Sequence, residues 1–96
     1  MDYLISEETA NKLREKHHVF LDEVIECFDN RRTRTIDDTR DEHRTFPPTK
    51  WFIGETNAGR RLKVVFIKIS ETETVIRTAY PPDDIEEEIY ERKAKN

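Results

Sequence analysis

The chain has 96 residues, of which 34% are hydrophobic and 40% charged, and its formal net charge of −4 argues against a general nucleic-acid binder. This length is typical of one domain, here residues 1–96, and excludes a second hydrophobic core. The single cysteine excludes a disulfide framework and a cysteine-ligated metal site, and no apolar run approaches the ~20 residues that a membrane span needs.

Two short amphipathic helices are predicted at the N-terminal end. Ser6 precedes two glutamates, which is typical of a helix N-cap and first turn, and Leu13 and His17 follow at helical spacing. This pattern predicts a helix over 6–16, with His17 as a core histidine. Apolar residues then recur at i, i+3, i+4 and i+7 and predict a second helix within 21–28.

Three strands are predicted in the second half of the chain. Runs rich in aromatic and β-branched residues occupy 49–56, 61–69 and 74–80, and an Asn-Ala-Gly turn separates the first two. A further short edge strand is allowed at 34–37. These runs predict an antiparallel meander of three or four strands.

A last helix is predicted after the paired prolines that end the sheet. Asp83 and Glu86 have the spacing of a capping box, and the helix is expected over 83–92, with six acidic residues among the nine at 83–91. The element order predicts an α+β domain in which two N-terminal helices and one C-terminal helix cover the same face of an antiparallel sheet.

Alternation along the strands predicts which side chains share a face of the sheet. The face packed against the helices is expected to hold Phe52, Leu62, Val64, Phe66 and Ile76. The opposite, open face is expected to gather Glu55, Lys63 and Arg77. Strict alternation places Tyr80 on the core side. The alternation of side chains between the two faces can change, however, where a strand ends before two prolines.

The charges are unevenly distributed along the chain. Residues 31–68 hold ten Lys/Arg and five Asp/Glu, a net of +5, whereas the remainder holds seven and sixteen, a net of −9. A basic middle between acidic ends indicates either an anion-binding surface or ordinary solvated side chains.

Four segments match, in their order and spacing, the motifs of a known protein family. They are KHHV at 16–19, DTRDEHRTFPPT at 38–49, the hairpin WFIGET…GRRLKVVF at 51–66, and RTAY at 77–80. Together they resemble the BrnT-type toxins of the wider RelE-like family of bacterial toxin–antitoxin ribonucleases, in which a glycine usually stands at the position of His18. The resemblance implies a cytoplasmic, metal-independent endoribonuclease without cofactor. It would cleave mRNA, bind a cognate antitoxin that neutralises it, and form oligomers through that antitoxin.

Metal-free RNA cleavage needs a deprotonated 2′-hydroxyl, a protonated leaving oxygen and a stabilised phosphorane. Lys63 and Arg77 are the candidates for stabilising the phosphate charge, Glu55 or His43 is the candidate general base, and Tyr80 completes the catalytic set implied by the resemblance. The alternative is that the charged trio on the open face forms a cross-strand salt-bridge ladder and that His43 braces its loop.

Basic and aromatic side chains of the middle segment are the candidates for binding RNA. They are Arg40, Arg44, Lys50, Trp51, Arg60 and Arg61. Trp51 is expected either to anchor the core or to stack on a base. Arg31, Arg32 and Arg34 are candidates for contacts with the RNA backbone, with solvated surface as the alternative.

A second function stays open. The acidic last helix and the sequence pI of about 5.4 favour a catalytically silent module that keeps the toxin fold and uses it to bind a partner protein.

Overall fold

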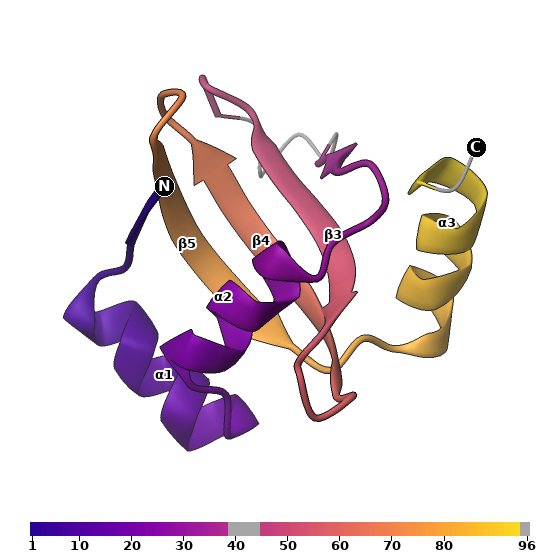
Figure 1. Ribbon diagram of the computed structural model, residues 1–96, viewed down its shortest axis with the longest axis horizontal. Helices are drawn as coiled ribbons and strands as arrows, with labels where there is room; N and C mark the ends of the chain where they lie inside the picture. The colour runs from indigo at the N-terminus through magenta and orange to yellow at the C-terminus, as the bar shows by residue number, and fades with distance from the viewer. Residues whose placement is uncertain (39–44, 95–96) are drawn as a thin grey trace.

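The computed structural model describes residues 1–38 and 45–94, which form three helices and a five-stranded mixed sheet (Figure 1). The elements are β1 (Asp2–Leu4), α1 (Glu7–His17), α2 (Leu21–Asp29), β2 (Ile36–Asp37), β3 (Thr49–Glu55), β4 (Arg61–Lys68), β5 (Glu73–Tyr80) and α3 (Asp84–Ala94). The α+β class is confirmed, whereas the sheet has more strands than predicted.

The ends of α1 follow from its sequence. The Ser6 side chain accepts a hydrogen bond from the Thr9 N–H at 3.0 Å and caps the first turn. At the other end His18 adopts a left-handed backbone conformation with φ 53°, and its N–H donates to the Arg14 carbonyl. Glycine adopts this conformation at least cost, which explains why a glycine suits this position.

The sheet has the strand order β1-β5-β4-β3-β2. The meander β3-β4-β5 is antiparallel as predicted, and the edge strand allowed at 34–37 is present as β2, paired antiparallel with β3. The prediction of a purely antiparallel sheet was wrong, because β1 pairs in parallel with β5, Asp2 lying beside Glu73. A strand of only three residues is too short to show a period of two in the sequence.

The helices cover both faces of the sheet, and the prediction that they share one face was wrong. Phe28 of α2 packs its ring 4.9 Å from that of Phe52, while Tyr90 of α3 packs 6.0 Å from Trp51 (ring centroids). Because neighbouring residues of a strand point to opposite faces, α2 and α3 lie on opposite sides of β3. Figure 1 shows α1 and α2 in front of the strands and α3 apart from them, beyond β3.

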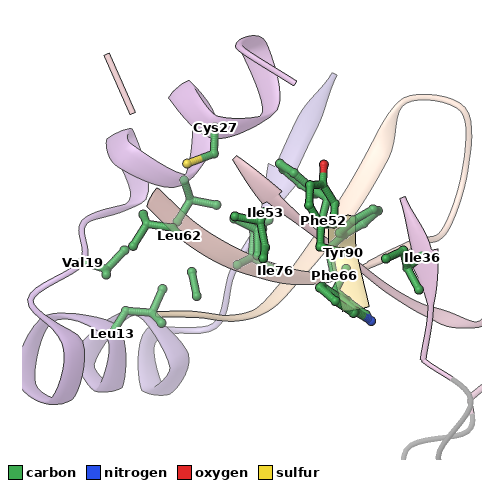
Figure 2. Close-up of a cluster of buried hydrophobic side chains, with 14 of the residues drawn as sticks. Leu13, Val19, Cys27, Ile36, Phe52, Ile53, Leu62, Phe66, Ile76 and Tyr90 are labelled. Atoms are coloured by element: carbon green, nitrogen blue, oxygen red, sulfur yellow. The ribbon is translucent and has the colours of Figure 1, made fainter. Parts of the chain in front are cut away.

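The core between the sheet and the first two helices has the composition that alternation predicted. Phe52, Leu62, Val64, Phe66 and Ile76 are all buried (Figure 2). The other face is also buried, because Trp51, Ile53, Tyr90 and Ala94 form part of the same apolar cluster. Within the described residues, no helix is both long and apolar enough to cross a bilayer.

Candidate functional site

A β-bulge in β5 decides which side chains meet on the face beneath α3. The register with β4 shifts between Val65 and Phe66, and Arg77 is the extra residue. Beyond the bulge, Tyr80 pairs with Lys63 and therefore projects on the same face as Lys63. The register shift turns the Tyr80 side chain to the other face of the sheet, which brings its hydroxyl and the Lys63 ammonium together.

Lys63 and Tyr80 converge on one carboxylate oxygen of α3. The Lys63 Nζ donates to Glu86 Oε2 at 2.6 Å, and the Tyr80 hydroxyl donates to the same oxygen at 2.7 Å. The Lys63 Nζ also lies 4.6 Å from the centroid of the Trp51 ring, where a cation is attracted to the π face. We call Lys63, Tyr80, Glu86 and Trp51 the Lys63 cluster.

Glu86 links the sheet to the start of α3. Its other oxygen, Oε1, accepts from the Asp83 N–H at 3.1 Å, while the Asp83 side chain accepts from the Glu86 N–H, which is the predicted capping box. Burial alone would raise the pKa of Glu86, but hydrogen bonds from Lys63 and Tyr80 outweigh it and lower this pKa. Glu86 is therefore a carboxylate at neutral pH.

The Lys63 cluster is largely shielded from solvent. The side chains of Lys63 and Glu86 are 8% and 17% exposed. A hollow of about 210 Å³ opens beside the cluster. Its lining residues are Ile36, Asp37, Asp38, Trp51, Lys63, Glu86, Ile89 and Lys93.

A second charged contact fixes α3 next to the first. Arg61 binds Glu87 through Nε at 2.8 Å and Nη2 at 2.7 Å, and its Nη1 lies 3.2 Å from Glu55. This two-point arginine–carboxylate contact is the geometry in which guanidinium pairs are strongest. Two consecutive glutamates of α3 thus bind two basic side chains of β4.

His17 lies beside the Lys63 cluster, which the sequence analysis did not expect. It is half-buried, and its ring centroid lies 5.5 Å from that of Tyr80. Glu86 was expected only as a capping residue. The KHHV motif, which contributed to the resemblance, could have marked His17 as a candidate site residue. No local sequence pattern linked Glu86 to Lys63.

Two residues of the predicted catalytic set lie apart from the cluster. Arg77 is exposed and lines a hollow of about 400 Å³ against α1, together with Lys12, Lys16 and His17. Glu55 is exposed at the end of β3 and contacts Arg61. The predicted convergence of Glu55, Lys63 and Arg77 on one open face is therefore wrong, because the bulge redirects Arg77 and α3 covers Lys63. His43 lies outside the described residues.

The predicted RNA-binding residues have diverse surroundings. Arg60 donates from its two terminal nitrogens to the carbonyls of His17 and His18, each at 2.8 Å, and so braces the link after α1. Lys50 pairs with Asp37 of β2 at 2.6 Å. Trp51 is 7% exposed, which agrees with the core-anchor alternative. Arg40 and Arg44 lie outside the described residues.

No protein-family model matches the sequence, and a search of curated proteins finds no match. Among the described residues, no group of three or more His, Cys, Asp and Glu side chains is arranged to hold a metal ion.

Proposed function

We propose that this chain is a BrnT-like toxin of the RelE-like type, an endoribonuclease that cleaves mRNA and is neutralised by a cognate antitoxin. The observation that carries the proposal is the contact of Lys63 and Tyr80 with a single anionic oxygen, at 2.6 and 2.7 Å. A phosphate oxygen of RNA has the charge and acceptor character of that carboxylate oxygen. The order of two helices, a strand meander and a last helix is compatible with the same assignment.

In this proposal the residues around Tyr80 divide the proton transfers between them. His17 accepts the proton of the 2′-hydroxyl, whose oxygen attacks phosphorus, and Tyr80 donates a proton to the leaving 5′-oxygen. The products are a 2′,3′-cyclic phosphate and a free 5′-hydroxyl. The Lys63 ammonium stabilises the additional negative charge of the phosphorane.

In this proposal α3 leaves the sheet before RNA is cleaved. A Glu86 oxygen occupies the position beside the Lys63 ammonium that a phosphate oxygen would take, and Glu87 binds the guanidinium of Arg61. In the closed arrangement the two carboxylates compete with any phosphate. We therefore propose that displacement of α3 activates the enzyme.

A catalytically silent module that binds a partner protein is the second candidate. It is favoured by the burial of Lys63 beneath α3 and by the separate position of Arg77 on the α1 side of β5. In this alternative the Lys63 cluster only attaches α3 to the sheet.

Induction of the chain in a bacterial host separates the two candidates. The ribonuclease proposal predicts growth arrest and loss of mRNA, with 2′,3′-cyclic phosphate ends on the fragments. Tyr80→Phe, which keeps the ring and removes the hydroxyl, should reduce cleavage by roughly 100-fold or more, as expected for loss of a general acid. Arg14→Ala, an exposed arginine of α1, is the matched control. A native chain that neither arrests growth nor cleaves RNA would favour the silent module.

The partner proposal has its own test. Where a small protein is encoded next to this chain, its co-expression should restore growth if that protein is the antitoxin. Restoration should depend on a stable complex, measured by co-purification of the two chains and by the mass of the assembly. Growth arrest that persists alongside a well-expressed neighbour would exclude that neighbour as the antitoxin.

A further inference from the structure

A third hollow lies at the edge of β3, beyond the short strand β2. Its volume is about 480 Å³, within the ~300–1,000 Å³ typical of small-molecule sites. Residues after α2, the β3–β4 hairpin and Tyr90 of α3 enclose it. The lining residues are Asn30, Arg31, Arg32, Thr33, Ile53, Gly54, Glu55, Thr56, Asn57, Arg61 and Tyr90, and we call this hollow the arginine pocket.

The arginine pocket is basic in a chain whose net charge is negative. Its lining holds three arginines and one glutamate. Arg61 is bound to Glu87 and Glu55, but Arg31 and Arg32 have no ion-pair partner in the described part of the chain. The Arg31 guanidinium donates to the Thr33 carbonyl, which holds it near the pocket and leaves its other N–H groups for a ligand.

Tyr90 supplies a buried hydroxyl whose proton has no acceptor. The residue is 2% exposed, the Ile53 backbone interacts with the hydroxyl oxygen, and within residues 1–38 and 45–94 no group accepts the hydroxyl proton. A buried O–H donor without an acceptor is rare because desolvation without a hydrogen bond is costly. Burial raises the pKa of Tyr90, so the hydroxyl stays protonated and can donate to an anion.

Two asparagines give the pocket a fixed polar wall. The Asn30 amide nitrogen donates to the Glu55 carbonyl at 2.9 Å and to the Asn57 side-chain oxygen at 3.0 Å. The Asn57 N–H in turn donates to Glu26 at 2.9 Å. These contacts orient the two side chains and leave the Asn30 oxygen and the Asn57 amide nitrogen without a partner among the described residues.

We propose that the arginine pocket binds the phosphate ester of a nucleotide. The planar guanidinium groups of Arg31 and Arg32 match two phosphate oxygens each, and the Tyr90 hydroxyl donates a further hydrogen bond. The asparagine amides offer one acceptor and one donor to a base edge. The pocket does not include the Lys63 cluster, so this inference stands independently of the proposed ribonuclease activity.

Titration of the full chain, followed by NMR chemical shifts, tests the proposal. The probes are a nucleoside, its 5′-monophosphate, inorganic phosphate and a six-residue RNA with 2′-O-methyl riboses, which prevents cleavage. The monophosphate should bind saturably, shift residues 30–33 and 53–57, and bind at least about tenfold more tightly than the nucleoside. Tighter binding of the RNA would identify a strand phosphate as the natural ligand, and equal or weaker binding would identify a free nucleotide.

Variants assign the binding to the pocket. Arg31→Ala combined with Arg32→Ala should weaken phosphate binding by about tenfold or more, and Tyr90→Phe by roughly threefold to tenfold. Arg14→Ala removes an equivalent exposed charge from α1 and should change nothing. Thermal unfolding of each variant reports whether it is folded. The proposal is overturned if no phosphate-bearing probe binds, or if folded variants bind as tightly as the native chain.

Discussion

The contact between Lys63 and Glu86 gives a quantitative test of what holds α3 on the sheet. Replacing Glu86 with alanine removes the acceptor of two side-chain hydrogen bonds and leaves the Lys63 ammonium, 8% exposed, without its counter-ion. Removing one member of a buried pair costs ~3–5 kcal/mol, and the lost capping box adds ~1 kcal/mol. Attraction of the ammonium to the Trp51 ring offsets ~1–2 kcal/mol. We expect a net loss of about 3 kcal/mol.

Urea unfolding followed by Trp51 fluorescence measures this loss, because the only tryptophan of the chain lies against the Lys63 ammonium. Glu88→Ala is the matched control on the same helix, and its exposed side chain should contribute within ~0.5 kcal/mol. The double variant Lys63→Met with Glu86→Met removes both charges and should recover most of the stability, because apolar replacement of a buried pair is often neutral.

Two results would refute this explanation. If Glu86→Ala costs no more than Glu88→Ala, the buried pair does not hold α3. If the double variant is as unstable as Glu86→Ala alone, the loss comes from the helix cap and not from an unpaired buried ammonium.

Four further predictions follow from single groups. The pKa of Glu86 is lowered in the folded state, so its stabilising contribution is present above the unfolded pKa of about 4.3 and is lost as the pH falls through the folded pKa. Urea unfolding at several pH values should therefore show an acid-sensitive part of the stability that Glu86→Gln lacks. His18→Gly should raise the free energy of unfolding by ~0.5–1 kcal/mol, measured by thermal unfolding, because φ there is 53°. Gly54→Ala should cost ~1–3 kcal/mol in the same assay, since the new methyl group would lie 2.8 Å from a ring carbon of Phe52. Burial raises the pKa of Cys27 to about 12, so iodoacetamide should label it only after denaturation, as read by mass spectrometry.

Local features of this fold could be predicted from the sequence, because they depend on neighbouring residues. The Ser6 cap and the Asp83–Glu86 capping box are formed as expected. The core face of the central strands also followed from alternation alone, with Val64 and Phe66 buried. These features extend over a few residues, where spacing carries the information.

The side on which α3 lies could not be predicted in the same way. The face beneath it alternates charged and apolar residues, with Lys63 beside Trp51 and Ile53, and such a pattern suits either an open or a covered face. The decisive contact joins Lys63 to Glu86, 23 residues apart, and follows from the path of the chain after the sheet. The packing of Tyr90 of α3 against Trp51 of β3 also joins this helix to the sheet.

The candidate site was only partly predictable for a related reason. Lys63 and Tyr80 were selected from the sequence, but the bulge that brings them together depends on an extra residue that no turn signal marks. Strict alternation therefore assigned Arg77 to the wrong group of side chains. His17, expected only in the core, borders Tyr80, and no local sequence pattern predicted that contact.

The parallel pairing of β1 with β5 has a consequence for synthesis on the ribosome. Residues 2–4 are translated well before their strand partners, residues 73–75, so β1 cannot form this pairing until β5 has been made. Closing so long a loop has an entropic cost that local helix formation does not have. Although β1 precedes the other strands in the chain, it is thus among the last to complete its backbone hydrogen bonds, and the β1 edge of the sheet forms only after β5 has been made.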